Sequence, residues 1–351
     1  MSYSITVEPS GRQFTAEADQ TILAAGISHS IPLPYGCQDG ACGSCKCLKI
    51  SGEVEMGTHS DKALSEAEKA AGFILTCRSK AQSDVVLENK QVTDSNAFPV
   101  KKLPVRVFAI EDQAPDVKRV VLQLPAGAPL QFHAGQFIEF ILQDGSRRSY
   151  SMGNAPHTVA IAATEDSPAA NRIELHIRHL PGGKFTDSLF GGNIKEKAIL
   201  RAEGPLGGFY LREGDKPVVL LASGTGFAPI KALIEHLQFE GSSRPIHFYW
   251  GGRRPQDLYM HNWVLAKAAE MPTLQYTPVI SDALPEDNWS GRTGFVHAAV
   301  AQDLADLSGF EVYACGAPIV IDSASKLYTT QHGLPTEAFF SDSFTSEADK
   351  S

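Results

Sequence analysis

The hydrophobic pattern changes character twice along the chain, which predicts three successive parts. Residues 3–18 alternate polar and apolar positions around a Pro-Ser-Gly turn, as expected for a β-hairpin. Short helices are predicted at 19–30, with Asp19 as the N-cap, and at 64–72, and a closing strand is predicted at 83–89. The first part is therefore expected to be a small mixed sheet with a helix packed on it.

The second part is a series of apolar stretches separated by short turns. The predicted strands lie at residues 105–113, 117–124, 136–142, 147–152, 172–180 and 197–204. Their close spacing favours an antiparallel barrel.

From residue 216 onward, strands alternate with helical segments, and this alternation predicts a parallel α/β sheet. The chain is therefore expected to be multidomain. The predicted limits are 1–93 for the first domain, 94–103 for a linker, 104–212 for the barrel and 213–351 for the α/β domain. The linker is polar, contains Pro and lacks periodicity, and the tail 346–351 is expected to be disordered.

Composition narrows the class of protein. The 351 residues carry a net charge of −9, which argues against a general nucleic-acid binder. The apolar runs are too short to span a membrane, and no charged and apolar leader opens the sequence. We expect a cytoplasmic protein, monomeric, without membrane or nucleic-acid partners.

Cysteine spacing points to the first candidate chemistry. Cys37, Cys42 and Cys45 form a C-x4-C-x2-C run, and Cys77 follows in the next apolar segment. This is the ligand spacing of a plant-type [2Fe–2S] cluster. The residues between the cysteines are small, so backbone N–H groups can point at the cluster. We predict these four cysteines as the iron ligands.

Two other uses of the cysteines are less well supported. Structural zinc sites usually take two C-x2-C pairs, and only Cys42 and Cys45 fit that template. Disulfide frameworks belong to short secreted chains. Cys47 is expected to be a packed side chain in a strand, with a role as a substitute ligand if Cys45 is removed.

The barrel segment carries a candidate phosphate site. Arg148-Ser149-Tyr150-Ser151 lies in one predicted strand, and a diglycine turn opens a helix further on. The residues at that turn are Gly182, Gly183, Lys184 and Thr186. A helix start with Lys and Thr can bind a phosphate, and an arginine fork can take more phosphate oxygens. Together they favour a flavin pyrophosphate site, although a barrel without flavin is the alternative.

A second phosphate loop opens the α/β part. A buried strand runs into Gly224-Thr225-Gly226 and then a helix, which places backbone N–H groups toward a pyrophosphate. Pro229 stands where the third glycine of G-x-G-x-x-G would be, so a two-lobed NAD dehydrogenase is disfavoured. Further on, Cys315-Gly316 ends a strand at the carboxyl edge of the sheet, where α/β proteins bind ligands.

The R-x-Y-S, G-T-G-x-x-P and C-G-x-P motifs together resemble the ferredoxin–NADP⁺ reductase superfamily. The order of parts resembles its three-domain NADH-dependent reductases. The segments "DGACGSCKC", "RRSYS", "SGTGFAP", "HFYWG", "GFVH", "VYACG" and "FFSD" together resemble, among these, the CDP-6-deoxy-Δ3,4-glucoseen reductases. The resemblance implies a β-grasp [2Fe–2S] ferredoxin domain, an FAD-binding barrel and an NAD-binding domain. It also implies that Tyr150 packs on the flavin ring, Ser151 hydrogen-bonds near its N5 and Cys315 lies beside the nicotinamide.

The C-terminal segment "AFFSDSF" also matches the superfamily. The resemblance places Asp342 and Phe344 next to the flavin ring, with Phe339 and Phe340 competing for the aromatic position.

The expected function is transfer of electrons from NADH through FAD to the cluster and on to a redox partner enzyme. A dehydrase is the expected partner and an oxygenase component is the alternative, while a non-catalytic redox-sensing module is the alternative of another class. FAD is favoured over FMN because residues 203–213 offer a glycine-rich loop for an adenine. NADH is favoured over NADPH, although Arg253 and Arg254 by themselves would suit a 2′-phosphate.

Overall fold

The structure is a computed structural model that describes residues 1–92, 97–127, 130–162 and 170–345. The first residues of the predicted linker, 94–96, and the predicted disordered tail lie outside the described residues. The chain divides into two compact units. The first contains residues 1–100 with 207–209 and the segment from 342, and the second contains 101–206 and 210–341.

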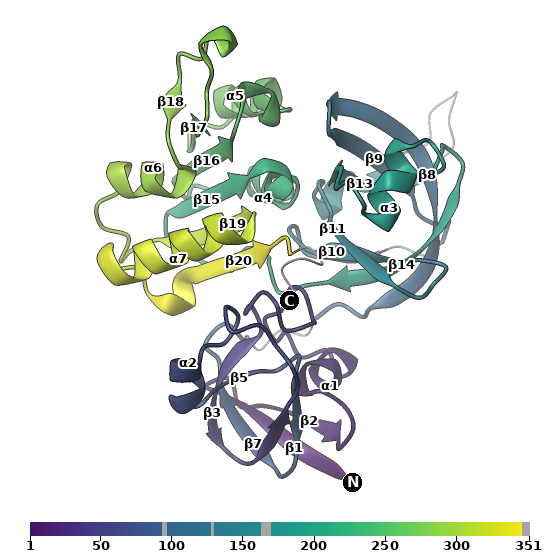
Figure 1. Cartoon of the computed structure of the whole chain (residues 1–351), viewed down its shortest axis with the longest axis vertical. Coiled ribbons are helices and arrows are strands. Elements are labelled where there is room, and N and C mark those ends of the chain that lie inside the picture. Colours follow the sequence, from purple (N-terminus) through teal and green to yellow (C-terminus); the bar gives the residue numbers. More distant parts are fainter. Residues whose placement is uncertain (93–96, 128–129, 163–169, 346–351) are drawn as a thin grey trace. The chain divides into compact units, whose positions relative to one another are not determined.

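The first unit is built on a small mixed sheet, as the sequence predicted (Figure 1). The strand order is β2 (Arg12–Glu17), β1 (Ser2–Glu8), β7 (Val85–Glu88), β3 (Lys46–Ser51) and β5 (Phe73–Leu75). β1 and β2 form the expected antiparallel hairpin, and β7 runs parallel to β1. A second, two-stranded sheet pairs β4 (Val54–Met56) with β6 (Ser79–Ala81).

Two short helices accompany these sheets, α1 (Ile22–Ser28) and α2 (Glu66–Ala70). The prediction of Asp19 as the cap of the first helix is wrong, because Thr21 is the N-cap and its hydroxyl accepts the N–H of Ala24 at 3.3 Å. Either side chain can cap a helix, and the point at which the backbone leaves the turn decides between them.

The second unit begins with the antiparallel barrel. Its strand order is β11 (Arg147–Ser151), β10 (Phe137–Ile141), β14 (Ile199–Leu206), β8 (Lys101–Ala114), β9 (Val117–Gln123), β13 (Ala170–Arg178) and β12 (Ala160–Ile161). An antiparallel bridge between Met152 and Leu175 joins the end of β11 to β13 and closes the sheet. The six predicted strands are confirmed, and α3 (Lys184–Phe190) follows the diglycine turn.

The α/β part of this unit has a six-stranded sheet. Its order is β18 (Arg292–Thr293), β17 (Leu274–Ile280), β16 (Ile246–Gly252), β15 (Val218–Ser223), β19 (Glu311–Gly316) and β20 (Phe339–Ser343). The strands from β18 to β19 are parallel, as the alternation predicted.

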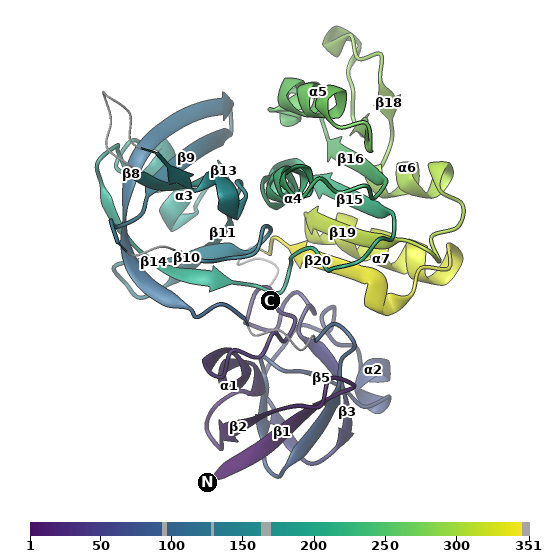
Figure 2. The same cartoon turned by 180° about the vertical axis from the view of Figure 1, so that it is seen from behind.

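Helices cover both faces of this sheet (Figures 1 and 2). α4 (Phe227–Phe239) and α5 (His261–Glu270) lie on one face, and α6 (Val296–Asp303) and α7 (Pro318–Gln331) lie on the other. Among the residues described, no helix is both long and apolar enough to cross a membrane.

Candidate functional site

The four predicted iron ligands form two close pairs in the first unit. The N–H of Cys37 points at the Cys42 sulfur at 3.4 Å, and the N–H of Cys42 points back at the Cys37 sulfur at 3.3 Å. The sulfurs of Cys45 and Cys77 are 3.2 Å apart, although their positions are 32 residues apart in sequence. Each iron of a [2Fe–2S] cluster takes two protein thiolates, so two pairs suit this group.

The pKa shifts of these four thiols favour a bound cation. Hydrogen bonding to Cys45, burial and the negative charges of the other three thiols raise the pKa of Cys77. The pKa of Cys37 is raised in the same way by Cys42, whereas the protons of Cys37 and Cys77 lower the pKa of Cys42 and Cys45. In each pair, one thiolate is therefore stabilised by its partner's proton. Metal binding requires thiolates, and a cation that replaces those protons removes the repulsion among them.

Two glycines give the cysteine loop its shape. Gly40 and Gly43 have φ of +86° and +75°, a region that side chains disfavour. A Cβ on Gly40 would lie 2.9 Å from Cγ of Arg78, and one on Gly43 would lie 3.0 Å from the carbonyl oxygen of Ala63. Gly40 and Gly43 are therefore required by left-handed backbone and close approach.

Cys47 belongs to the core of the first unit, as predicted. It lies in β3 opposite Ile74 and is 1% exposed. Burial raises the pKa of its thiol to about 12, so it stays protonated at neutral pH.

The predicted flavin strand is β11. The Tyr150 ring lies 5.7 Å from the ring of Phe140 and 5.3 Å from that of Phe185. Ser151 is buried opposite Phe137, and Arg148 is half-buried, with Nη1 donating to the Arg147 carbonyl at 2.7 Å. β11 therefore places Arg148, Tyr150 and Ser151 together on one strand of the barrel.

The diglycine turn is closed by Thr186. Its hydroxyl donates to the Leu180 carbonyl at 2.9 Å and accepts the Leu180 N–H at 3.2 Å, so it shapes the turn from within. Gly182 has φ of +83°, and Gly183 is the N-cap of α3. Lys184 is exposed and forms an ion pair with Asp144, a partner that the sequence did not indicate.

The dinucleotide loop and the C-G-x-P motif interlock. A Cβ on Gly226 would lie 2.1 Å from the carbonyl oxygen of Cys315, and a Cβ on Gly316 would lie 2.4 Å from that of Ser223. Gly316 also has φ of +134°. Only glycine can occupy either position, because a side chain would overlap the neighbouring backbone. Cys315 itself is fully buried.

The other residues of the Gly224–Gly226 loop are held in place by contacts with neighbouring elements. Gly224 and Thr225 lie in a 3₁₀ turn before α4, and the Gly224 carbonyl accepts the indole N–H of Trp250 at 3.0 Å. Pro229 is buried in the first turn of α4, where a proline costs the helix no hydrogen bond. The strand–turn–helix arrangement predicted for a pyrophosphate is therefore present.

The C-terminal residues divide between the two units. Phe339 and Phe340 are buried, and Phe340 stacks on Tyr313 at 4.7 Å. Both competing aromatics therefore belong to the core of the second unit. Asp342 is buried and Phe344 is half-buried, both in the first unit, whereas Ser151 and Cys315 lie in the second.

Within the glycine-rich segment 203–213, Gly208 belongs to the first unit. Its N–H donates to the Tyr35 carbonyl at 3.1 Å, and a Cβ there would lie 2.9 Å from the Pro34 Cα. Close backbone approach therefore explains this glycine. The Tyr210 ring stacks on that of His133 at 4.4 Å.

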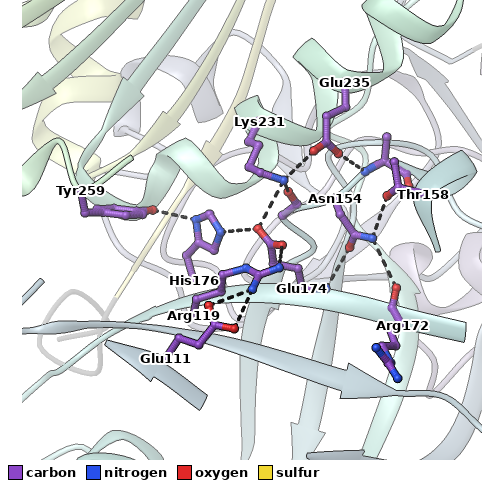
Figure 3. Close-up of polar contacts among 12 residues, drawn as sticks. Glu111, Arg119, Asn154, Thr158, Arg172, Glu174, His176, Lys231, Glu235 and Tyr259 are labelled. Carbon is purple, nitrogen blue, oxygen red and sulfur yellow. Dashed lines mark hydrogen bonds and ion pairs between the residues drawn. The ribbon is translucent and has the colours of Figure 1, made fainter. Parts of the chain in front are cut away.

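The sequence missed a buried polar cluster in the second unit. Glu174 and His176 on β13 meet Lys231 and Glu235 on α4 and Tyr259 after β16 (Figure 3). Polar and apolar residues alternate along β13 from Arg172 to Arg178, a pattern typical of a half-exposed strand, so the sequence does not indicate that Glu174 and His176 are buried.

Comparison with known proteins agrees with this architecture. Three family models match successive parts of the chain: the 2Fe-2S iron-sulfur cluster binding domain (residues 5–82), the oxidoreductase FAD-binding domain (104–210) and the oxidoreductase NAD-binding domain (220–326).

Similar proteins span the full length of the chain. The CDP-6-deoxy-L-threo-D-glycero-4-hexulose-3-dehydrase reductase of Yersinia pseudotuberculosis serotype I (strain IP32953) is 40% identical over 347 residues, covering 98% of this chain and 99% of the relative. The reductase component of propane 2-monooxygenase from Gordonia sp. (strain TY-5) is 32% identical over 355 residues, covering 99% and 98%.

A crystal structure of the Amycolatopsis cytochrome P450 reductase GcoB matches with a TM-score of 0.78 at 29% identity, covering 98% of this chain and 99% of that chain. The family resemblance read from the motifs is confirmed. The chain therefore belongs to the family of oxidoreductases that join a 2Fe-2S ferredoxin domain, an FAD-binding barrel and an NAD-binding domain into one electron-transfer reductase.

Proposed function

We propose that this reductase takes electrons from NADH and delivers them singly to a separate dehydrase. The choice of a dehydrase as the partner rests on the full-length similarity, at 40% identity, to a reductase named for a hexulose dehydrase. When bound, the flavin can accept electrons in pairs and release them one at a time, and the cluster carries single electrons.

The residues proposed to hold these groups are those the motifs marked. Cys37, Cys42, Cys45 and Cys77 bind the irons. By the motif resemblance, Arg148, Tyr150, Ser151 and the turn from Gly182 to Thr186 are the residues we propose for the flavin, and Asp342 and Phe344 are those we propose for its ring. The loop Gly224–Gly226 with Pro229, Cys315 and Gly316 binds the dinucleotide. Backbone N–H groups at the start of α4 suit a pyrophosphate, because the helix dipole favours negative charge there.

The second candidate partner is the terminal component of an oxygenase. It is favoured by the similarity to the propane monooxygenase reductase component, which also spans the chain. The non-catalytic sensing alternative is disfavoured, because the two full-length relatives described above are both named as reductases or reductase components.

A partner assay separates the two candidates. The NADH-reduced protein is mixed anaerobically with a purified hexulose dehydrase, a purified oxygenase component or cytochrome c as a nonspecific acceptor, and reoxidation of the cluster is followed by absorbance. We expect the dehydrase to accelerate reoxidation most. Faster transfer to the oxygenase component would reject the dehydrase proposal and retain the reductase.

We also propose a preference for NADH over NADPH. Arg254 lies 3.5 Å from both Asp282 and Asp287, so its charge is already balanced. Asp257 accepts the N–H groups of Arg253 and Arg254, at 2.7 and 3.0 Å, and places a carboxylate at the end of β16. The other oxygen of Asp257 lies 3.4 Å from Arg178, which offsets part of this negative charge, and an acid at this strand end still suits a ribose hydroxyl better than a 2′-phosphate.

Ferricyanide reduction with each nucleotide tests this preference. We expect kcat/KM to be higher for NADH. A higher value for NADPH that is lost in Arg253→Ala or Arg254→Ala would reverse the assignment.

The remaining proposals concern the state of the protein. We propose a cytoplasmic monomer with functional segments 1–93, 94–103, 104–212 and 213–351, and the limits of the three family matches support these segments. Light scattering of the purified protein tests the monomer, because a dimer would double the 37.8 kDa mass.

A further inference from the structure

A chain of polar side chains is buried where the barrel meets helix α4 and the loop after β16, all within the second unit (Figure 3). Lys231, Glu174 and His176 are 4%, 6% and 4% exposed. Buried charges are costly unless they are paired, so each member of this chain needs its partners in place.

Lys231 ties α4 to the end of the flavin strand. Its ammonium group donates to the carbonyl of Gly153 at 3.0 Å and lies 2.6 Å from Glu235 and 3.3 Å from Glu174. The other oxygen of Glu235 accepts the N–H of Ala155 at 2.8 Å. Both members of this Lys–Glu pair on α4 therefore hydrogen-bond to the backbone just after Ser151, at Gly153 and Ala155.

His176 extends the same chain to the loop after β16. Its Nε2 lies 2.7 Å from Glu174 and its Nδ1 lies 2.8 Å from the hydroxyl of Tyr259. An ionised carboxylate can only accept, so Nε2 carries the proton and Nδ1 accepts from Tyr259. Arg119 binds the second oxygen of Glu174 at 2.7 Å. The barrel, α4 and the loop after β16 are thus linked through the carboxylate of Glu174.

Sterics restrict the same junction. A Cβ on Gly153 would lie 3.2 Å from Nε2 of His176 and 3.5 Å from Cβ of Ala228, in the first turn of α4. The backbone after Ser151 therefore packs directly on the helix that follows the Gly224–Gly226 loop. A shift of α4 would break the contacts of Lys231 and Glu235 together.

Buried ion pairs often stabilise a protein no more than apolar residues of the same size would, but they can specify a single arrangement. We propose that Lys231 is a positioning residue for reduction of the flavin by NADH. Through Gly153, Glu174 and Glu235 it holds the dinucleotide-binding helix in one position against the flavin strand. The inference rests on the proposed function, because it assumes that NADH donates at this junction.

The first test uses the full-length protein loaded with FAD and the cluster. Lys231→Met removes the charge, and the double variant Lys231→Met with Glu235→Gln keeps the buried charge balanced if the single variant folds poorly. In stopped-flow reduction at saturating NADH, we expect the limiting rate constant to fall about tenfold to hundredfold, since misplacement by about 1 Å can cost that much. The dissociation constant for NADH should change little, and Lys231→Arg should restore part of the rate.

The second test reads the position without turnover. Hydrogen–deuterium exchange should become faster at the Ala155 amide and at the start of α4 in the Lys231 variants. Gly153→Ala, which adds one methyl group at the same junction, should lower the limiting rate without removing any charge.

Lys267→Met is the matched control. The Lys267 ammonium lies over the same indole ring, that of Trp263, as the Lys231 ammonium, at 5.9 and 5.1 Å. Its partners Gln238 and Glu270 both lie on the α/β side, so it should leave the rate and the exchange unchanged.

A double variant with normal FAD content, unchanged exchange at Ala155 and a limiting rate within twofold of wild type would overturn the inference. If the wild-type protein is not reduced by NADH at all, the proposed function fails instead.

Discussion

The cluster loop and the junction between the barrel and α4 are both polar sites, but they are built in opposite ways. Three of the four proposed cluster ligands lie within nine positions, Cys37 to Cys45. The junction instead gathers Gly153, Glu174, Lys231 and Tyr259 from separate elements. The first site is encoded by local spacing and glycines, and the second exists only once the second unit has folded.

The two sites also balance charge differently. The cluster thiols raise or lower one another's pKa and require external cations to become four thiolates. At the junction, Lys231 and Arg119 offset Glu174 and Glu235 within the protein. Loss of metal should therefore disrupt the loop and leave the junction intact.

The largest effect is expected when a single thiol of either cysteine pair is removed. Cys37→Ser, Cys42→Ser or Cys77→Ser should abolish or cripple the cluster, because one iron then loses one of its two protein ligands. Iron analysis should give about two irons per chain in the wild type and fewer in the variants, with loss of the EPR signal of the reduced protein.

Cys47→Ser is the control for that series, because Cys47 is as buried as Cys77 but lies outside the two pairs. It should keep the iron. Zinc in place of iron in the wild-type protein would contradict the cluster assignment.

The next largest effect is expected at the interlocked loop. Gly226→Ala would bring a Cβ to 2.1 Å from the Cys315 carbonyl, so the backbone must move where the dinucleotide is proposed to bind. Reduction by NADH should slow about hundredfold, while FAD and iron contents stay normal.

Gly309→Ala is the control, since its added Cβ has nothing within 4 Å. Equal rates in the Gly226 and Gly309 variants would show that the loop is not where NADH donates.

A smaller effect concerns acid stability of the junction. Burial lowers the pKa of His176, although its hydrogen bond to Glu174 opposes this. The folded state therefore holds His176 neutral, while the unfolded chain binds a proton below about pH 6.5. The free energy of unfolding should fall as the pH drops through that value. The slope should reach about 1 kcal/mol per pH unit where the unfolded chain binds one proton more than the folded state.

His176→Gln should flatten this part of the pH profile. All three tryptophans, Trp250, Trp263 and Trp289, lie in the second unit, so urea unfolding followed by their fluorescence reports on that unit. Parallel profiles for the wild type and the variant would mean that His176 is not the titrating group.

The smallest effect is expected at the outer end of the polar chain. Glu111 pairs with Arg119 at 2.9 Å but its side chain is 48% exposed. Glu111→Gln should change the free energy of unfolding by less than about 1 kcal/mol, because solvent screens an exposed pair. A loss as large as that of a buried member would show that burial does not set the importance of each group.

The sequence by itself determined the order of the three parts, most of their strands and the proposed ligand set. Alternation with period two and the alternation of strands with helices follow from local packing of each element, so they can be read from the order of residues alone. The crowded cysteines and the Gly-Thr-Gly loop are equally local, since their chemistry depends on spacing and on backbone that only small residues allow.

Tertiary structure alone decided the helix cap at Thr21, the Lys184–Asp144 pair and the buried chain through Glu174. Residues 173–177 alternate apolar and polar in the sequence, which predicts an exposed face for Glu174 and His176, yet the structure buries all five. Their partners lie on other elements, and only the packing of α4 against the barrel brings Lys231 within reach. Spacing along the chain carries no information about such contacts, because they depend on how separate elements meet in three dimensions.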